Sequence, residues 1–408
     1  MTYGTHLAVD LDKITENARR VTELCNAHGI EVLGVTKGFS AQPEIVSAML
    51  RGGIEKLADA RLENVICLRQ HGFTQHVTLL RIPMLSQAKR VVEYCDCSLN
   101  SEIEVIRALS AAALEQGKRH DIILMIEVGD LREGIVPSAA AALLRHTMPL
   151  QGVRVVGIGT NMGCYGGILP TQRNLGFLAY MADALSAIAG GPFAVVSGGG
   201  TSSLVVAKEG RMPHAINQVR VGEAILLGTD STNGQRLDWL NQDAFLLRAE
   251  IVEQNRKPTI PIGEVGLDAF GNQPVFEDKG IRQRAIVALG RQDVPLDGVF
   301  PCDPGVRILG ASSDHMILDI EESAQSYRVG DMIELRLNYK GMLRACSSRY
   351  IPHVYLRSRR HRQAGNVTVK VVFPSLHKAL TVPPWRSTIF FTTARPTPLP
   401  SAAWDSSA

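Results

Sequence analysis

The feature that most constrains the fold is a regular alternation of short apolar runs and amphipathic stretches between residues 30 and 228. The stretches at 102–116 and 171–189, for example, repeat apolar residues every three or four positions, as helices do. The eight predicted strands are 31–35, 56–59, 77–82, 97–99, 122–128, 153–160, 193–196 and 219–226. Strands that alternate with helices in this way predict a (β/α)8 barrel, with an open doubly wound sheet as the alternative.

The pattern changes after residue 236, where strand-like runs follow one another without long helical patterns. These runs are 244–253, 284–289, 316–320 and 332–337, and turns rich in Gly, Pro and Asp separate them. We therefore expect the barrel to occupy residues 10–236 and a mostly antiparallel β domain to occupy residues 237–357. Residues 1–9 are predicted to add one N-terminal strand to the β domain.

The last 51 residues, 358–408, have a different composition from the rest of the chain. They contain seven Lys and Arg residues, one acid and several prolines, which predicts a basic and disordered tail. The tail has a net charge of +6 in a chain of net charge +3, so the remaining residues have a net charge of −3. The basic balance is therefore confined to the tail, and it gives no reason to predict nucleic-acid binding.

Composition also indicates the compartment and the classes of site. The chain contains no run of about 18 apolar residues, and its N-terminus lacks the apolar core of a secretory signal. The seven cysteines are odd in number and scattered, which favours a reducing, cytoplasmic location. Cys95 and Cys97 have no second pair or histidine cluster to accompany them, so no metal site is predicted.

Chemically useful side chains follow the predicted barrel strands at their carboxyl ends, where barrel enzymes place their sites. Lys37 follows the first strand, Arg132 the fifth and Asn161 the sixth. Arg220 and Gly222 lie within the eighth strand segment. We therefore expect these residues to meet at one mouth of the barrel.

The seventh strand runs into Ser197-Gly-Gly-Gly-Thr-Ser-Ser203, which resembles an anion cradle. Three glycines let backbone N–H groups approach a phosphate, and Ser202 and Ser203 add hydroxyl donors. A lysine amine on the same rim can form an imine with an aldehyde, so the pair suggests pyridoxal phosphate. A solvated lysine and a flexible glycine turn are the alternative interpretations.

Arg220 narrows the reaction type. An arginine beside the pyridine nitrogen does not give up its proton, so it would donate to an unprotonated ring and limit electron withdrawal. Weak withdrawal favours quick reprotonation at Cα, which leads to racemisation rather than transamination. A structural salt bridge at the end of the barrel is the other interpretation of Arg220.

Several segments together resemble one family, over roughly residues 5–356. They are 35–37 (VTK), 80–85 (LRIPML), 129–134 (GDLREG), 196–199 (VSGG), 219–223 (VRVGE), 262–271 (IGEVGLDAFG) and 309–315 (LGASSDH). The chain resembles the alanine racemase-like, fold-type III pyridoxal phosphate enzymes, and within them the ornithine racemase branch. The resemblance implies a barrel followed by a β domain, a homodimer with shared sites, and two-base racemisation of ornithine or a related basic amino acid.

The resemblance also implies a role for individual residues. Lys37 would bind the cofactor and act as the base on one face, Arg220 would face the pyridine nitrogen, and Arg132 would lie near the phenolic oxygen and the substrate. The implied phosphate contacts are Ser202, Ser203, Gly222 and Tyr339.

The chain departs from alanine racemases at two places. Asn161 stands where those enzymes place a histidine against the cofactor ring, and the stretch 263–271 lacks the tyrosine that they use as the second base. Asp268 and His315, presented by the partner subunit, are the candidates for that base. Asp268 and Asp314 are the candidates for binding a cationic substrate side chain, with Glu264 and Glu277 as further acids.

Other functions remain open at this point. A fold-type III decarboxylase would bring a cysteine and an aspartate from the β domain, for which Cys302 and Asp303 are a weak match. A racemase of neutral amino acids such as alanine is a second alternative. A non-catalytic carrier of the cofactor fits single-domain barrels better than a chain with a β domain.

Overall fold

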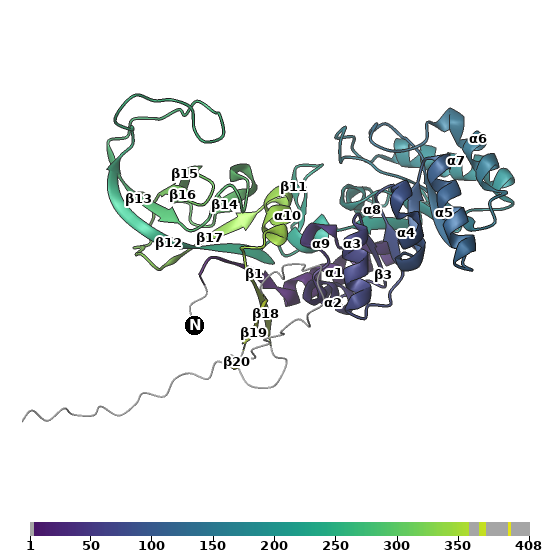
Figure 1. Ribbon diagram of the computed structural model, residues 1–408, viewed down its shortest axis with the longest axis horizontal. Coiled ribbons are helices and arrows are strands. Elements are labelled where there is room, and N and C mark those ends of the chain that lie inside the picture. The colour runs from purple at the N-terminus through teal and green to yellow at the C-terminus, as the bar shows by residue number, and fades with distance from the viewer. Residues whose placement is uncertain (1–3, 359–366, 373–390, 393–408) are drawn as a thin grey trace, which may run out of the picture.

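The computed structural model describes residues 4–358, 367–372 and 391–392. Eight parallel strands, β2 to β9, close into a barrel in chain order, and the barrel with its helices forms the right-hand part of the molecule in Figure 1. They are β2 (Glu31–Val35), β3 (Lys56–Asp59), β4 (Val77–Leu79), β5 (Cys97–Asn100), β6 (His120–Met125), β7 (Val153–Thr160), β8 (Val195–Gly198) and β9 (Gln218–Val221). The predicted barrel is therefore confirmed, and the open doubly wound sheet is wrong.

The ring closes where the first and last barrel strands pair. β2 and β9 run parallel in the register Glu31↔Gln218 to Gly34↔Val221. Apolar side chains such as Leu99, Ile123 and Met125 fill part of the interior as a small buried cluster. The barrel is thus a packed core whose strand ends are free to present functional groups.

Helices follow most of the barrel strands and cover the outside of the barrel. They are α1 (Leu11–Asn26), α2 (Pro43–Arg51), α3 (Leu62–Gln70), α4 (Ala88–Tyr94), α5 (Ile103–Glu115), α6 (Pro137–Thr147), α7 (Gln172–Ala189), α8 (Leu204–Lys208) and α9 (Glu223–Leu227). Several strand ends were predicted wrongly by a few residues, and the largest error is in the apolar run 219–226, which is a strand only as far as Val221. Gly222 ends that strand and stands at the N-cap of α9, whose residues Ala224 to Leu227 are buried.

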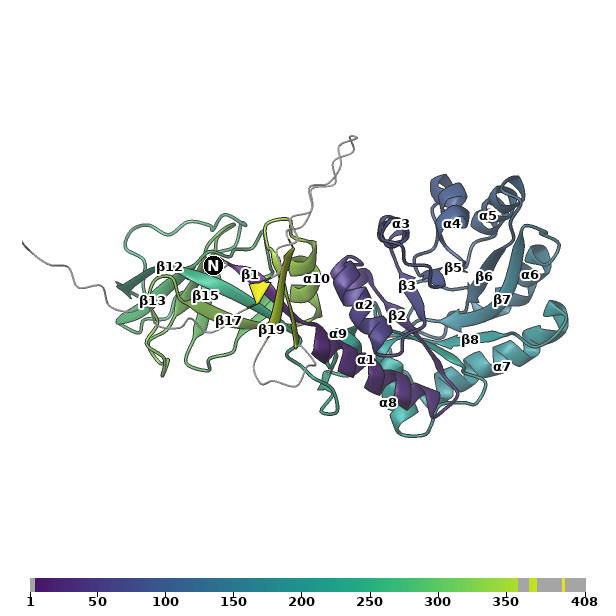
Figure 2. The ribbon, with the colours of Figure 1, turned by 90° about the horizontal axis from the view of Figure 1, so that it is seen from below.

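The β domain is a mixed and mostly antiparallel sheet (Figure 2). Its strands are β1 (His6–Asp10), β12 (Phe245–Pro258), β13 (Ile281–Val287), β14 (Val299–Pro301), β15 (Arg307–Ala311), β16 (Met316–Asp319), β17 (Met332–Leu337), β18 (His353–Ser358), β19 (Val367–Val372) and β20 (Phe391–Thr392). β1 lies between β12, to which it is antiparallel, and β18, to which it is parallel. The short strands β10 (Thr229–Asp230) and β11 (Gln235–Arg236) form a separate hairpin.

Most of the predicted tail, 358–408, lies outside the described residues. Its described part differs from the predicted disorder, because β19 pairs antiparallel with β18 from His353↔Val372 to Ser358↔Val367. The sequence Val-Thr-Val-Lys-Val-Val has the β-branched residues that favour a strand, a signal that the basic surroundings obscured.

The helix α10 (Tyr339–Ser347), which was not predicted, brings the β domain onto the mouth of the barrel. Asn338 caps it by accepting a hydrogen bond from Gly341 N at 3.0 Å. A Cβ added at Gly38 would lie 3.0 Å from Met342 Cε and 3.5 Å from Tyr339 Cε2. The first turn of α10 therefore packs against the turn that carries Lys37.

Among the described residues, no helix has both the length and the apolar character needed to cross a membrane. We propose to retain the predicted domain limits, 10–236 for the barrel and 237–357 for the β domain. The barrel strands and the long β12 fall on either side of that limit.

Candidate active site

Lys37 lies at the carboxyl end of the first barrel strand, in a tight turn. Thr36 is fully buried, and the half-buried Lys37 begins the 3-10 turn η1 (Lys37–Phe39). Ser40 and Ala41 follow with φ angles of 53° and 52°, a left-handed region that residues with a side chain rarely adopt. The turn thus holds the lysine on the rim of the barrel in one specific and strained backbone conformation.

Asp59, at the end of the neighbouring strand β3, is a site residue that the sequence analysis missed. Its side chain is fully buried and accepts a hydrogen bond from Thr36 Oγ1 at 2.5 Å. Burial raises the pKa of Asp59, and the positive charge of Lys37 opposes that rise. A carboxylate therefore lies within electrostatic reach of the candidate catalytic lysine.

Arg220 reaches across the barrel interior from β9. One guanidinium nitrogen donates to Ser197 Oγ, and the other donates to the Thr160 carbonyl oxygen at 2.6 Å. Its side chain is buried, and no ion pair within the described part of the chain includes it. Burial lowers the pKa of Arg220 to about 10, so the guanidinium stays protonated at neutral pH. The predicted salt-bridge interpretation of Arg220 is therefore wrong.

The glycine-rich loop after β8 makes a tight turn at Gly199. Gly199 has a φ of +98°, and a Cβ at this position would lie 2.7 Å from Ser203 Oγ. Ser203 Oγ donates to the Gly198 carbonyl oxygen at 2.6 Å, which fixes the start of the 3-10 turn η3 (Thr201–Ser203). Ser202 and Ser203 are both buried, and Thr201 Oγ1 accepts a hydrogen bond from the backbone N–H of Ala224 at 3.3 Å, which joins this loop to the first turn of α9.

Tyr339 enters the same region from the β domain. It is half-buried, and desolvation raises the pKa of its hydroxyl to about 12. The nearby charges of Glu223, which follows Gly222, and of Asp59 contribute to the same rise. Tyr339 therefore lies within electrostatic reach of the start of α9, and its ring packs against the Lys37 turn at Gly38.

Asn161 and Arg132 belong to two loops that Asp130 holds together. Asp130 is buried, and its carboxylate accepts backbone N–H bonds from the loop after β7, including that of Gly163 at 2.9 Å. Asn161 Nδ2 is buried and has no hydrogen-bond partner among the described residues. Arg132 is partly exposed, and its guanidinium binds the Glu133 carboxylate through two nitrogens.

Asp268, Asp314 and His315 lie away from these groups, in the β domain of the same chain. Asp268 belongs to the long loop 259–280 between β12 and β13, which Figure 1 shows at the far end of the β domain from the barrel. Asp314 and His315 are exposed in the turn between β15 and β16. Within one chain, these residues therefore do not join the groups on the rim of the barrel.

Arg291 connects the two β-domain segments to each other, and the sequence analysis did not single it out. Its Nε donates to the Ala311 carbonyl oxygen at 3.0 Å. Its Nη2 lies 3.9 Å from Asp268 Oδ2, and its guanidinium carbon lies 4.4 Å from the centre of the Phe270 ring. The Asp268 loop and the 311–315 turn therefore form one unit around a single side chain.

Comparison with known proteins now adds to this geometry. Residues 9–230 match the family model described as the N-terminal domain of alanine racemase. The chain is 40% identical over 349 residues to a lysine racemase of Thermotoga maritima, covering 86% of this chain and 98% of that protein. It is 39% identical over 346 residues to an ornithine racemase of Acetoanaerobium sticklandii, covering 85% of this chain and 98% of that protein.

The chain belongs to the alanine racemase family.

Solved structures agree with this assignment at the level of the fold. An alanine racemase of Streptomyces lavendulae superposes with a TM-score of 0.71 at 19% identity, covering 88% of this chain and 99% of that protein. The arrangement of the barrel and the β domain in this chain is therefore similar to that in the solved enzyme.

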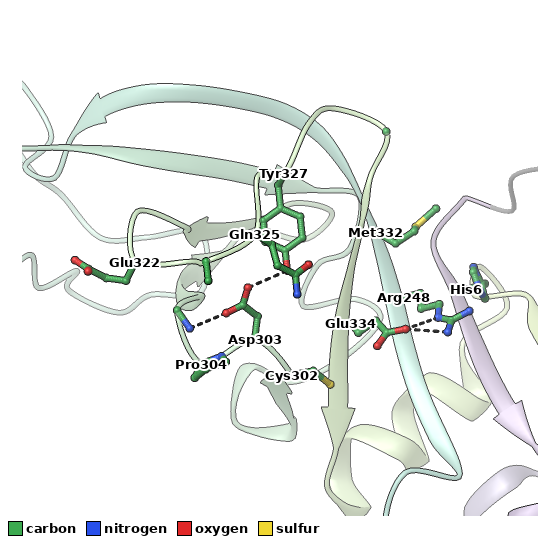
Figure 3. Close-up of a pocket in the computed structure, with 13 residues that line it drawn as sticks. His6, Arg248, Cys302, Asp303, Pro304, Glu322, Gln325, Tyr327, Met332 and Glu334 are labelled. Carbon is green, nitrogen blue, oxygen red and sulfur yellow. Dashed lines mark hydrogen bonds and ion pairs between the residues drawn. The ribbon is translucent and has the colours of Figure 1, made fainter.

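Cys302 and Asp303, the weak match to a decarboxylase, do not lie with Lys37 and Arg220. Both residues line a cavity of about 710 Å³ on the β domain (Figure 3). Asp303 is already bound there by Ser323 Oγ at 2.6 Å and Tyr327 Oη at 3.1 Å. Neither Lys37 nor Arg220 lines this cavity, so its size does not make it the centre of the chemistry.

Proposed function

We propose that the protein racemises ornithine or lysine, using pyridoxal phosphate bound to Lys37. The two relatives at 39% and 40% identity are named for ornithine and for lysine, and the match extends over nearly the whole of both proteins. A basic amino acid is therefore a better supported substrate than alanine.

The residues of the barrel mouth fit this cofactor. Lys37 supplies the amine, and the turn of Gly199 with Ser202 and Ser203 supplies donors for a phosphate. Asn161 Nδ2 is a buried donor that has no acceptor among the described residues. Such an orphaned donor is expected where a ligand completes the site.

The environment of Arg220 is the observation that best supports racemisation as the reaction. Within the part of the chain that the structure describes, this buried guanidinium makes hydrogen bonds only to neutral groups, Ser197 Oγ and the Thr160 carbonyl oxygen, and such a charge is costly to maintain without a further role. Placed at the pyridine nitrogen, it would donate a hydrogen bond and keep the ring unprotonated. That arrangement favours return of a proton to Cα, which is what racemisation requires.

The remaining chemistry is proton transfer by this chain's own groups. The cofactor, when bound, withdraws electrons from Cα and acidifies its proton. Lys37 would remove or deliver that proton on one face of Cα, and a second group would do so on the opposite face. We propose Asp268 or His315 of the partner subunit for the second face, and Asp268 and Asp314 of that subunit as contacts for the cationic end of the substrate. Arg132 is proposed to orient the cofactor and the substrate.

A homodimer follows from this assignment, because Asp268 and His315 lie far from the barrel of their own chain. The loop that carries Asp268 is also unusually apolar for a free surface. Ile262, Leu267 and Val275 have exposed fractions of 95%, 69% and 94%. Apolar side chains concentrated on one exposed loop are typical of a surface that another protein covers, here a second copy of this chain.

The test of the reaction is chiral chromatography after incubation with pyridoxal phosphate and L-ornithine, L-lysine or L-alanine in turn. We expect D-ornithine or D-lysine to form fastest, and we expect Lys37→Ala to abolish the conversion. Formation of the decarboxylated diamine in place of the D-amino acid would overturn the proposal.

The test of the shared site is subunit complementation. Lys37→Ala and Asp268→Ala homodimers would each be inactive, whereas a mixed dimer would contain one site free of both substitutions. Unfolding and refolding the two variants together should therefore restore part of the activity. If the mixture stays as inactive as its components, Asp268 does not act across a subunit interface.

A further inference from the structure

The environment of Asp59 is the unassigned feature that bears most directly on Lys37. Its Oδ1 accepts hydrogen bonds from the backbone N of Arg61 at 2.7 Å and from Asn64 Nδ2 at 3.1 Å. Its Oδ2 accepts from Asn64 Nδ2 at 3.1 Å and from Thr36 Oγ1 at 2.5 Å. Both carboxylate oxygens are therefore held, and one of the donors is the residue that precedes Lys37.

A buried carboxylate at position 59 destabilises the fold. The Asp59 side chain is fully buried, and none of the ion pairs among the described residues includes it. A buried charge without a close ionic partner destabilises a protein strongly unless hydrogen bonds offset the lost hydration. Its hydrogen bonds offset part of that cost, and they fix it beside the Lys37 turn rather than elsewhere in the core.

Burial raises the pKa of Asp59, and its hydrogen bonds to Thr36, Arg61 and Asn64 oppose that rise, as does the charge of Lys37. The hydrogen bonds to Thr36 and Arg61 therefore hold the carboxyl group at the end of β3, beside the turn that begins at Lys37.

We propose that Asp59 is a positioning residue for Lys37, which holds the Lys37 turn through the Thr36 hydroxyl. The proposal rests on the proposed function in so far as Lys37 is the base that exchanges a proton with Cα. Thr36 is the mechanical link, because its hydroxyl binds Asp59 and its backbone N–H donates to the Ala58 carbonyl oxygen at 2.9 Å. The lysine turn is thus tied to the end of β3 at two points.

The positioning role is tested in the cofactor-free protein by acetylating lysines at one fixed pH and quantifying Lys37 by peptide mass spectrometry. Asp59→Asn replaces one acceptor oxygen with an NH2 donor, so hydrogen bonds that hold the turn are lost. We expect Lys37 to be labelled severalfold faster in this variant, because its turn is held less firmly. An unchanged labelling rate would overturn the positioning role.

The matched control is Asp121→Asn, because Asp121 follows the first residue of β6, at the opposite end of a barrel strand, where it pairs with Arg154. Lys37 in this variant should be modified as in the unaltered protein. Equally faster labelling in both variants would show a general effect of losing negative charge and would also overturn the proposal.

The mechanical link is tested with Thr36→Val and Thr36→Ser, which also decide the question if Asp59→Asn does not fold. Thr36→Val replaces only the hydroxyl, with a methyl group of similar size. We expect this variant to have a kcat about tenfold lower, while KM changes little. Thr36→Ser keeps the hydroxyl and should restore kcat. A wild-type kcat in Thr36→Val would overturn the positioning role. Failure of Lys37→Ala to abolish racemisation would instead overturn the proposed function, and it would leave the labelling result intact.

Discussion

The guanidinium of Arg291 lies over the ring of Phe270, with 4.4 Å between the guanidinium carbon and the ring centre. The same side chain donates to the Ala311 carbonyl oxygen and lies 3.9 Å from Asp268. One residue thus fixes the relative positions of two segments that are about 40 residues apart in the chain and that hold all the proposed partner-subunit groups.

Arg291→Gln should therefore release the loop 259–280 without unfolding the β domain. We expect amide hydrogen exchange in residues 262–276 to accelerate about fivefold, because a cation–π contact and a charge contact contribute roughly 1 kcal/mol together. Exchange mass spectrometry measures this directly. Arg256→Gln is the control, since Arg256 pairs with Glu321 on the same domain. Equal exchange in all three proteins would contradict the role of Arg291.

Replacement of Arg220 by lysine should impair catalysis although the charge is kept. The two hydrogen bonds to Ser197 and Thr160 need the planar fork of the guanidinium, which an ammonium group does not reproduce. We expect kcat to fall roughly hundredfold, as when one aimed donor is lost from an active site. Steady-state kinetics with L-ornithine checks this, and unaltered kcat would show that Arg220 is structural.

Two buried histidines should make the protein sensitive to acid. Burial lowers the pKa of His120 and of His353 to about 4, from an ordinary value of 6.5. Between these values the unfolded chain binds protons that the folded chain does not, so stability is full above about pH 6.5 and falls as the pH drops. Each histidine would contribute a loss of up to about 1.4 kcal/mol per pH unit.

The measurement for the histidines is the melting temperature between pH 7.5 and pH 5. We expect His353→Gln to melt lower than the unaltered protein at pH 7.5, but to lose less of its melting temperature on acidification. A parallel decline of both proteins would show that other groups govern the acid sensitivity.

Gly290 allows the segment before Arg291 to approach the 311–315 turn. A Cβ at Gly290 would lie 2.0 Å from the Ser313 carbonyl oxygen, a clash with backbone that has no easy relief. Gly290→Ala should therefore reduce the free energy of unfolding by on the order of 1–3 kcal/mol, as overpacking does. By contrast, Gly176→Ala lies within α7 with no atom near its Cβ and should increase stability by about 0.5–1 kcal/mol. Denaturant titration distinguishes these opposite signs.

The strand β19 makes it possible to test whether this part of the tail stabilises the β domain. A chain that ends at residue 358 would leave the β18 edge unpaired, whereas one that ends at residue 373 would keep the β18–β19 ladder. We expect the shorter chain to melt a few degrees lower and to aggregate more readily, because it exposes an open strand edge. Identical melting and solubility of the two chains would show that β19 adds nothing to the domain.

Local pattern was sufficient to predict the barrel, because strands and helices alternate with clear apolar periodicity. It failed at 219–226, where an unbroken apolar run contains a strand, Gly222 and a buried helix. Lys37, Arg220 and the glycine-rich loop were identifiable because each follows or ends a strand with unusual chemistry. Asp59 was not, since a single aspartate at a strand end carries no signal until the Thr36 contact is known. Arg291 was not identified either, because its contacts with Asp268, Phe270 and Ala311 are visible only in the structure.

The position of β1 between β12 and β18 affects how the chain can fold as it is made. The first strand leaves the ribosome well before either of its neighbours, which begin at residues 245 and 353. Its apolar residues Leu7 and Val9 have no sheet to join while all eight strands of the barrel are being synthesised. The nascent protein therefore has to carry an unpaired strand next to a finished barrel until β12 emerges, and one edge of that strand stays open until β18 follows.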